Sequence, residues 1–304
     1  MRSFVAVLTI VALSLIVAAA LAYPTWMLVG FVADQPIHRV MHRVAMISSA
    51  LGFLWLFRRC GVLNRHALGF GPPHAMFWQQ MAVGLGVGVL LILPLVGALF
   101  AIGVRAPRSG LDLSLAHAIR LVGVGLATGL VVAAIEEVFF RGLLFAAVRR
   151  DSGTAAAIVL PSLLYAALHF LSGRLYQPAE QIEWSSGLAV LGGMFAKYAH
   201  PAAIADSFLA LFAVGALLAL VRAHTRSIAA CIGLHAAWVC IIALVRNSTL
   251  VQEHPANWLV GDYDGVLGWA ALVWMAMIAA TYFITARDIR IRTAETIATS
   301  EQRA

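Results

Sequence analysis

Eight long apolar runs divide this chain into segments that can each cross a lipid bilayer as a helix. A membrane-spanning helix needs roughly 20 apolar residues, and a backbone within lipid has to satisfy its own hydrogen bonds, which favours helices. The runs cover residues 4–32, 40–57, 75–104, 118–148, 155–172, 203–222, 227–245 and 264–286. The sequence therefore predicts an all-α fold, a polytopic transmembrane helical bundle of about eight spans.

The composition argues against a water-soluble globule. The chain of 304 residues has 62% hydrophobic and 12% charged residues, whereas soluble domains carry about 25% charged residues. Its arginines lie in short clusters between the apolar runs, with no basic patch that interleaves aromatic residues, so no nucleic-acid partner is expected. We expect an integral, multi-pass membrane protein whose surface contacts membrane lipid.

The basic residues indicate how the chain is oriented in the membrane. The loops on the side of the N-terminus hold more of them than the loops on the opposite side. Because basic loops are retained in the cytoplasm, both termini are expected to be cytoplasmic. The compact chain and its Arg-rich loops favour a prokaryotic source, and the expected location is the bacterial inner membrane.

The first apolar run leaves its processing open. Ala20-Leu21-Ala22 resembles the small-residue site at which signal peptides are cleaved. The apolar stretch continues past that site to Val32, and only Arg2 precedes it as a basic residue. An uncleaved first span is therefore favoured, with a cleaved signal peptide as the alternative.

Two further features concern packing. The longest loop, residues 173–202, is expected to hold a short interfacial helix. Gly84, Gly86 and Gly88 in the third run predict close packing of that helix against a neighbour, because small residues let membrane helices approach each other.

Ionisable side chains inside the apolar runs are the most informative feature for function. The fourth run contains Glu136, Glu137 and Arg141, and a charge at mid-membrane costs about 2.5–3.5 kcal/mol on insertion scales. Glu137 and Arg141 are four residues apart, so they share a helix face and can pair. Glu136 points about 100° away on the same helix, so it is free to face a different neighbour.

Two histidines lie at similar depth in other runs, His169 in the fifth and His235 in the seventh. A bundle that gathers them with the two glutamates holds a base, a proton donor and possible metal ligands, a set suited to activating water. Each residue alone also has a structural interpretation, as a packed histidine or a bridging ion pair. A buried acid also serves proton transport in other membrane proteins.

In these residues the chain resembles the CPBP family of intramembrane proteases, which includes the type II CAAX prenyl endopeptidases. The family shows Glu-Glu-x-x-x-Arg, then Phe-x-x-x-His, then His-x-x-x-Asn on successive helices. Glu136, Glu137 and Arg141 match the first motif, and His169 and His235 match the histidines of the other two. The resemblance covers residues 118–245.

Two positions depart from the family motifs. Tyr165 stands where Phe is usual, and Val239 stands where the third motif has Asn. The missing amide removes a hydrogen-bond donor, which the neighbouring Trp238 indole or a backbone group would have to replace.

The resemblance implies hydrolysis of a peptide bond within the membrane, in a membrane-associated protein or peptide substrate. It implies that Glu136 is the general base that activates water, helped by His169. It assigns stabilisation of the oxyanion to His235 and the third-motif Asn, and gives Glu137 and Arg141 the role of holding the geometry.

Cofactor use follows from the same residues. Glu136, His169 and His235 would make a two-His, one-Glu zinc set, but the chain has no His-Glu-x-x-His motif. We predict that the protein needs no cofactor, with zinc as the alternative.

The chain is thus expected to have three regions. Residues 1–117 form N-terminal transmembrane helices of about three spans, residues 118–245 form the CPBP-like catalytic core, and residues 246–304 form a loop, the last transmembrane helix and a cytoplasmic tail. Two other functions stay open. One is a proton-coupled transporter, and the other is a non-catalytic binding or immunity protein of the same family, an alternative motivated by Val239.

Overall fold

A computed structural model describes residues 1–31, 35–112, 114–171 and 176–301 of the chain. Within these residues, six helical stretches are long and apolar enough to cross a membrane. They are α1 (Arg2–Gly30), α2 (Ile37–Arg59), α4 (His74–Ala101), the continuous stretch Leu115–Phe170, α8 (Pro201–Thr225) and α9 (Ala229–Ser248).

The stretch Leu115–Phe170 contains more than one helix. It consists of α5 (Leu115–Glu137), a π-helical segment η1 (Val138–Leu144) and α6 (Phe145–Phe170). Gly153 interrupts α6 with φ +81° and ψ 177°, so the chain turns there and crosses again.

The last helix, α10 (Trp269–Glu301), has a shorter apolar part, Trp269–Thr285. Together with the turn at Gly153 it brings the number of crossings close to the eight that the sequence predicts. The expected all-α transmembrane bundle is confirmed.

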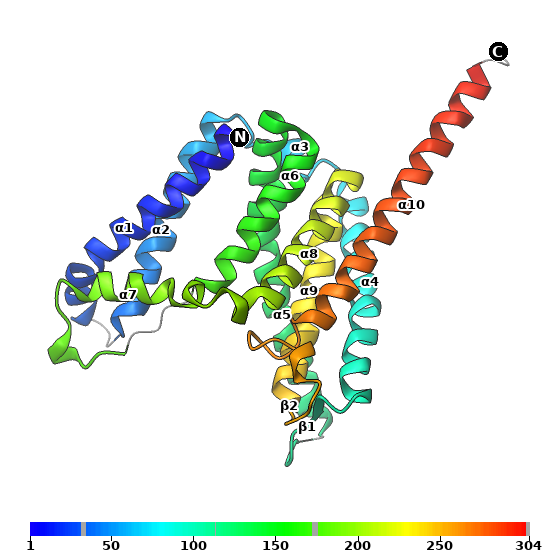
Figure 1. Cartoon of the computed structure of the whole chain (residues 1–304). Coiled ribbons are helices and arrows are strands. Elements are labelled where there is room, and N and C mark those ends of the chain that lie inside the picture. Colours follow the sequence, from blue (N-terminus) through cyan, green and yellow to red (C-terminus); the bar gives the residue numbers. More distant parts are fainter. Residues whose placement is uncertain (32–34, 113, 172–175, 302–304) are drawn as a thin grey trace.

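The helices form a main bundle and a helix pair beside it (Figure 1). In the main bundle α9 packs most extensively against α4 and α5, and α8 packs against α6 and α10. The pair α1–α2 contacts the bundle through α6 at the end where the chain starts. Two short strands, β1 (Arg105–Pro107) and β2 (Thr249–Val251), pair antiparallel at the opposite end of the bundle.

The connections also contain short helical segments. The expected helix in loop 173–202 is present as α7 (Ser186–Met194), which packs against α1 and α2. Residues 172–175, at the end of the fifth expected span and the start of that loop, lie outside the described residues, as does Val32 at the end of the first expected span. The remaining short segments are α3 (Arg65–Leu68), η2 (Ala179–Gln181), η3 (Ala196–Ala199) and η4 (Asn257–Leu259).

Close backbone contact between α4 and α9 positions the helix that carries His235. A Cβ on Gly233 would lie 2.1 Å from the carbonyl oxygen of Met81, and one on Gly84 would lie 2.4 Å from that of Ala230. Only glycine fits at these two positions. The expected packing role is confirmed for Gly84, whereas a Cβ on Gly86 would meet nothing within 4 Å.

Candidate active site

The acidic motif lies where an α-helix changes into a π-helix. α5 ends at Glu137, and η1 begins at Val138 and carries Arg141. Single π turns occur frequently at functional sites, because the wider turn re-aims the side chains that it carries. Both glutamates thus lie in the last turn of α5, and Arg141 lies in the π-helical segment that follows.

Glu137 is the fully buried member of the acidic pair, with 0% exposure. Its Oε1 accepts a hydrogen bond from Nη1 of Arg141 at 2.9 Å and lies 2.8 Å from Nδ1 of His235. Arg141 also donates from Nη2 to the carbonyl oxygen of Gly215 at 3.1 Å. The pairing that the four-residue spacing predicts is therefore present, and it joins α5, η1, α8 and α9 around one carboxylate.

Arg141 also packs against aromatic rings. Its guanidinium carbon lies 4.8 Å from the ring centre of Tyr165 and 5.6 Å from that of Phe140. A cation over an aromatic face is attracted by the ring quadrupole. The buried charge thus has one carboxylate, one carbonyl and two rings as its neighbours.

A second buried arginine, Arg222, donates a hydrogen bond to the backbone of the acidic motif. Nε of Arg222 donates to the carbonyl oxygen of Arg141 at 3.0 Å, and its Nη2 donates to that of Ala67 at 2.8 Å. Arg222 is the last residue of the sixth apolar run, 203–222, and only 4% of it is exposed. The sequence feature that could have predicted this burial is the position of Arg222 in the last turn of an apolar helix rather than in the loop that follows.

Glu136 has different surroundings, since its side chain is 28% exposed and faces a cavity. Its Oε2 lies 3.8 Å from Nε2 of His235 and has no hydrogen-bond partner. Oε2 of Glu137 also lacks a partner, but the Oε1 atom of that residue holds two. Glu136 is therefore the carboxylate that remains available to a ligand or to water.

His169 has a defined tautomer. Its Nδ1 lies 2.7 Å from the carbonyl oxygen of Tyr165, and a carbonyl oxygen only accepts, so Nδ1 carries the proton. Nε2 then has a free lone pair when the ring is neutral. Among the described residues no hydrogen bond joins His169 directly to Glu136, although both line the same cavity.

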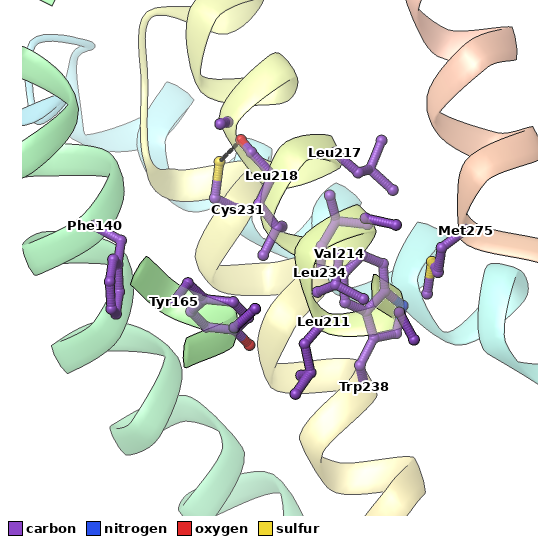
Figure 2. Close-up of a cluster of buried hydrophobic side chains, with 14 of the residues drawn as sticks. Phe140, Tyr165, Leu211, Val214, Leu217, Leu218, Cys231, Leu234, Trp238 and Met275 are labelled. Carbon is purple, nitrogen blue, oxygen red and sulfur yellow. Dashed lines mark hydrogen bonds between the residues drawn. The ribbon is translucent and has the colours of Figure 1, made fainter. Parts of the chain in front are cut away.

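The cavity has a volume of about 250 Å³, and its polar lining groups are concentrated at two levels. Glu136, Tyr165, His169 and His235 line its interior together with Tyr263, whose ring centre lies 6.2 Å from that of His169. Arg246 and Asp264 line it at the end near β2. The remaining walls are mostly apolar. Figure 2 shows part of them, with Leu211, Val214, Trp238 and Met275 gathered on the side opposite Phe140.

Among the groups at this end, Asp264 lies outside the spans. Burial raises the pKa of its carboxyl group above the usual value, while Arg246 and Arg105 act in the opposite direction.

The third motif lacks a side-chain donor at the expected position. Val239 lines the cavity. Of the two replacements considered for the missing amide, the Trp238 indole is already engaged, because its Nε1–H donates to the carbonyl oxygen of Gly88 at 3.1 Å. Tyr165 is the other departure from the motifs, and it also lines the cavity with a hydroxyl that makes no hydrogen bond to the described residues.

The alternative zinc set does not have the arrangement of a metal site. Within the described residues, no group of three or more His, Cys, Asp or Glu side chains is placed to hold a metal ion. We therefore derive no chemical step through a metal, and the absence of a cofactor stays a prediction.

Comparison with known proteins agrees with the motifs. Residues 118–241 match the family model described as Type II CAAX prenyl endopeptidase Rce1-like. No curated protein and no solved structure matches the chain. The matched segment runs from α5 into α9, so it includes the acidic motif and both histidines. The expected resemblance is confirmed over this segment: the chain is a multi-pass membrane protein in which residues 118–241 are similar to the CAAX protease family.

Proposed function

We propose that the protein is an intramembrane endopeptidase that hydrolyses a peptide bond of a membrane-associated protein or peptide with water activated by Glu136. One observation carries this proposal, namely the different surroundings of two adjacent carboxylates. Glu137 is buried against Arg141 and His235, whereas Glu136 faces the cavity without a hydrogen bond on Oε2. Two carboxylates in unlike environments are typical of a site that divides structural and acid–base roles.

In the proposed reaction, water binds in the cavity between Glu136 and Nε2 of His169. Glu136 takes a proton from the water, and the oxygen forms a bond to the carbonyl carbon while the π electron pair moves onto the carbonyl oxygen. The tetrahedral intermediate then collapses, the C–N bond breaks, and Glu136 returns its proton to the leaving nitrogen. A positioned base of this kind typically contributes about 10²–10⁴-fold to the rate.

The negative oxygen of the intermediate needs donors, and we assign this role to His235 and Tyr165. His235 lies between two carboxylates, with Nδ1 2.8 Å from Oε1 of Glu137 and Nε2 3.8 Å from Oε2 of Glu136, and the proposed role requires a proton on each of its ring nitrogens. Nδ1–H then donates to Glu137, and Nε2–H is directed to the cavity side. The Tyr165 hydroxyl supplies the second donor, in place of the amide that Val239 lacks.

The proposal extends to how the protein lies in the membrane. We place both termini in the cytoplasm of a bacterial cell, with the protein in the inner membrane. The end of the bundle with β1 and β2, where the cavity has its polar rim, is then extracytoplasmic. Reporter fusions after residue 108 and after residue 304 should report opposite sides of the membrane, and equal signals would contradict this orientation.

The central test uses the purified full-length protein in lipid nanodiscs with a library of peptides from membrane proteins. Mass spectrometry of new termini should reveal cleavage by the wild type and at least a hundredfold less by Glu136→Gln. Equal cleavage by the two proteins would refute the assignment of the base. Proton flux into liposomes that depends on Glu136, without any cleavage, would favour the transporter instead.

A further inference from the structure

One face of α9 follows the cavity from its interior to its rim. The lining residues of this helix are His235, Trp238, Val239, Ile242, Ala243 and Arg246. Steps of three and four residues keep these side chains on one helix face. At 1.5 Å per residue the helix advances about 16 Å between His235 and Arg246. The cavity therefore joins the proposed hydrolytic centre to a cation at its end.

The guanidinium of Arg246 is available to a ligand. The residue is exposed, and among the described side chains no carboxylate lies within 4.0 Å of it and no acceptor takes a hydrogen bond from it. Asp264 lies on the same rim, but its Oδ1 is engaged by the backbone N–H groups of Val266 at 2.9 Å and Leu267 at 2.7 Å. Arg246 thus keeps its donors free.

A second, more polar cavity of about 440 Å³ continues beyond the rim and shares Arg246 and Asp264 with the first. Its other charged lining residues are Arg105, Arg108 and Asp262. The three arginines outnumber the two acids, so an anion is favoured in this space over a cation.

Arg105 adds positive charge to this second cavity, but its guanidinium N–H groups are already engaged by other residues of the protein. Its guanidinium donates to Oγ1 of Thr249 at 2.8 Å and to the carbonyl oxygen of Gly265 at 2.6 Å. These bonds tie β1 to β2 and to the loop before α10, and only 4% of the residue is exposed. It therefore fixes the wall on which Arg246 lies.

We infer that Arg246 binds a carboxylate of the peptide substrate and so sets where the peptide is cut. The inference rests on the proposed endopeptidase function. An extended peptide advances about 3.3–3.6 Å per residue, so a path of about 16 Å corresponds to four or five residues. The substrate is thus an apolar segment with a carboxylate four or five residues from the scissile bond. Charge-assisted bonds from arginine to carboxylate are among the strong ones in proteins.

The test measures binding rather than turnover, in the Glu136→Gln protein held in phosphatidylcholine nanodiscs. The probes are two fluorescent apolar hexapeptides that are identical except for a free C-terminal carboxylate or a carboxamide. The free acid should bind about tenfold more tightly or better. Adding Arg246→Gln should bring the two affinities together, and Arg246→Lys should keep part of the difference.

The matched control is Arg120→Gln, which removes an exposed arginine at the same end of the bundle that lines neither cavity. It should leave the preference for the acid unchanged. A third probe, a carboxamide peptide that ends in Glu, separates the sources of the carboxylate. If it binds like the free acid, Arg246 accepts a side-chain carboxylate, and if it binds like the plain amide, Arg246 reads the chain terminus.

A preference for the acid that survives Arg246→Gln would overturn the inference, and so would a lack of binding by all three probes. Neither result depends on hydrolysis, since Glu136 is already replaced. Conversely, an absence of cleavage by the wild type would count against the proposed function while the Arg246-dependent preference still stood.

Discussion

His235 contacts Glu137 through one ring nitrogen, with Nδ1 2.8 Å from Oε1, and directs the other nitrogen toward the adjacent glutamate at 3.8 Å. One imidazole therefore connects the buried ion pair to the cavity. This relationship makes the two acids of the motif experimentally separable.

Glu136→Gln and Glu137→Gln should fail in different ways. The first should lower cleavage at least a hundredfold with little change in thermal stability, because its side chain makes no hydrogen bond on Oε2. The second leaves Arg141 buried without its charged partner, and breaking a buried pair costs about 3–5 kcal/mol. Thermal unfolding in detergent and cleavage assays on the same samples would measure both effects. Equal destabilisation by the two substitutions would contradict the assignment.

Tyr165→Phe should lower kcat with little effect on KM, because the hydroxyl is proposed to act only on the negative oxygen of the intermediate. Loss of one such donor typically costs about 10²–10³ in turnover. The double variant Tyr165→Phe with Val239→Asn should recover part of that loss, since it moves the donor to the position that the family uses. Full activity in Tyr165→Phe would remove this role.

Arg222→Met should destabilise the fold, because the buried carbonyl oxygen of Arg141 and the partly buried one of Ala67 lose the guanidinium donor. Each buried group without a partner costs about 1–3 kcal/mol. Arg226→Gln is the matched control, since it removes an exposed arginine at the end of the same helix. The comparison is a thermal-shift measurement, and similar midpoints for the two variants would count against a structural role for Arg222.

Gly233→Ala should push α4 and α9 apart, because the added Cβ would lie 2.1 Å from the carbonyl oxygen of Met81. Overpacking of this kind costs about 1–3 kcal/mol, and the shift should also reduce cleavage by moving His235. Gly86→Ala adds the same methyl group where nothing lies within 4 Å. It should therefore leave the unfolding temperature and the activity unchanged or slightly higher, and equal losses in both variants would refute the packing argument.

Much of the fold was accessible from the sequence. Long apolar runs imply spanning helices because lipid offers the backbone no other hydrogen-bond partner. The spacing of Glu137 and Arg141 implied their contact, which the structure contains. The role of Gly84 followed from its size, but Gly86 on the same helix could not be told apart from it, because helix rotation is set by neighbours.

The sequence by itself determined the class of fold, the approximate number of crossings and the set of ionisable residues at membrane depth, because these depend on local composition and on helical period. Only the tertiary structure decided that the Trp238 indole is hydrogen-bonded to the carbonyl oxygen of Gly88 and that Arg222 is buried against the backbone of Arg141. It also decided that Arg246 lines the cavity of the proposed active site. Those facts depend on which helix faces which, and contacts between residues far apart in the chain arise from packing rather than from any local pattern.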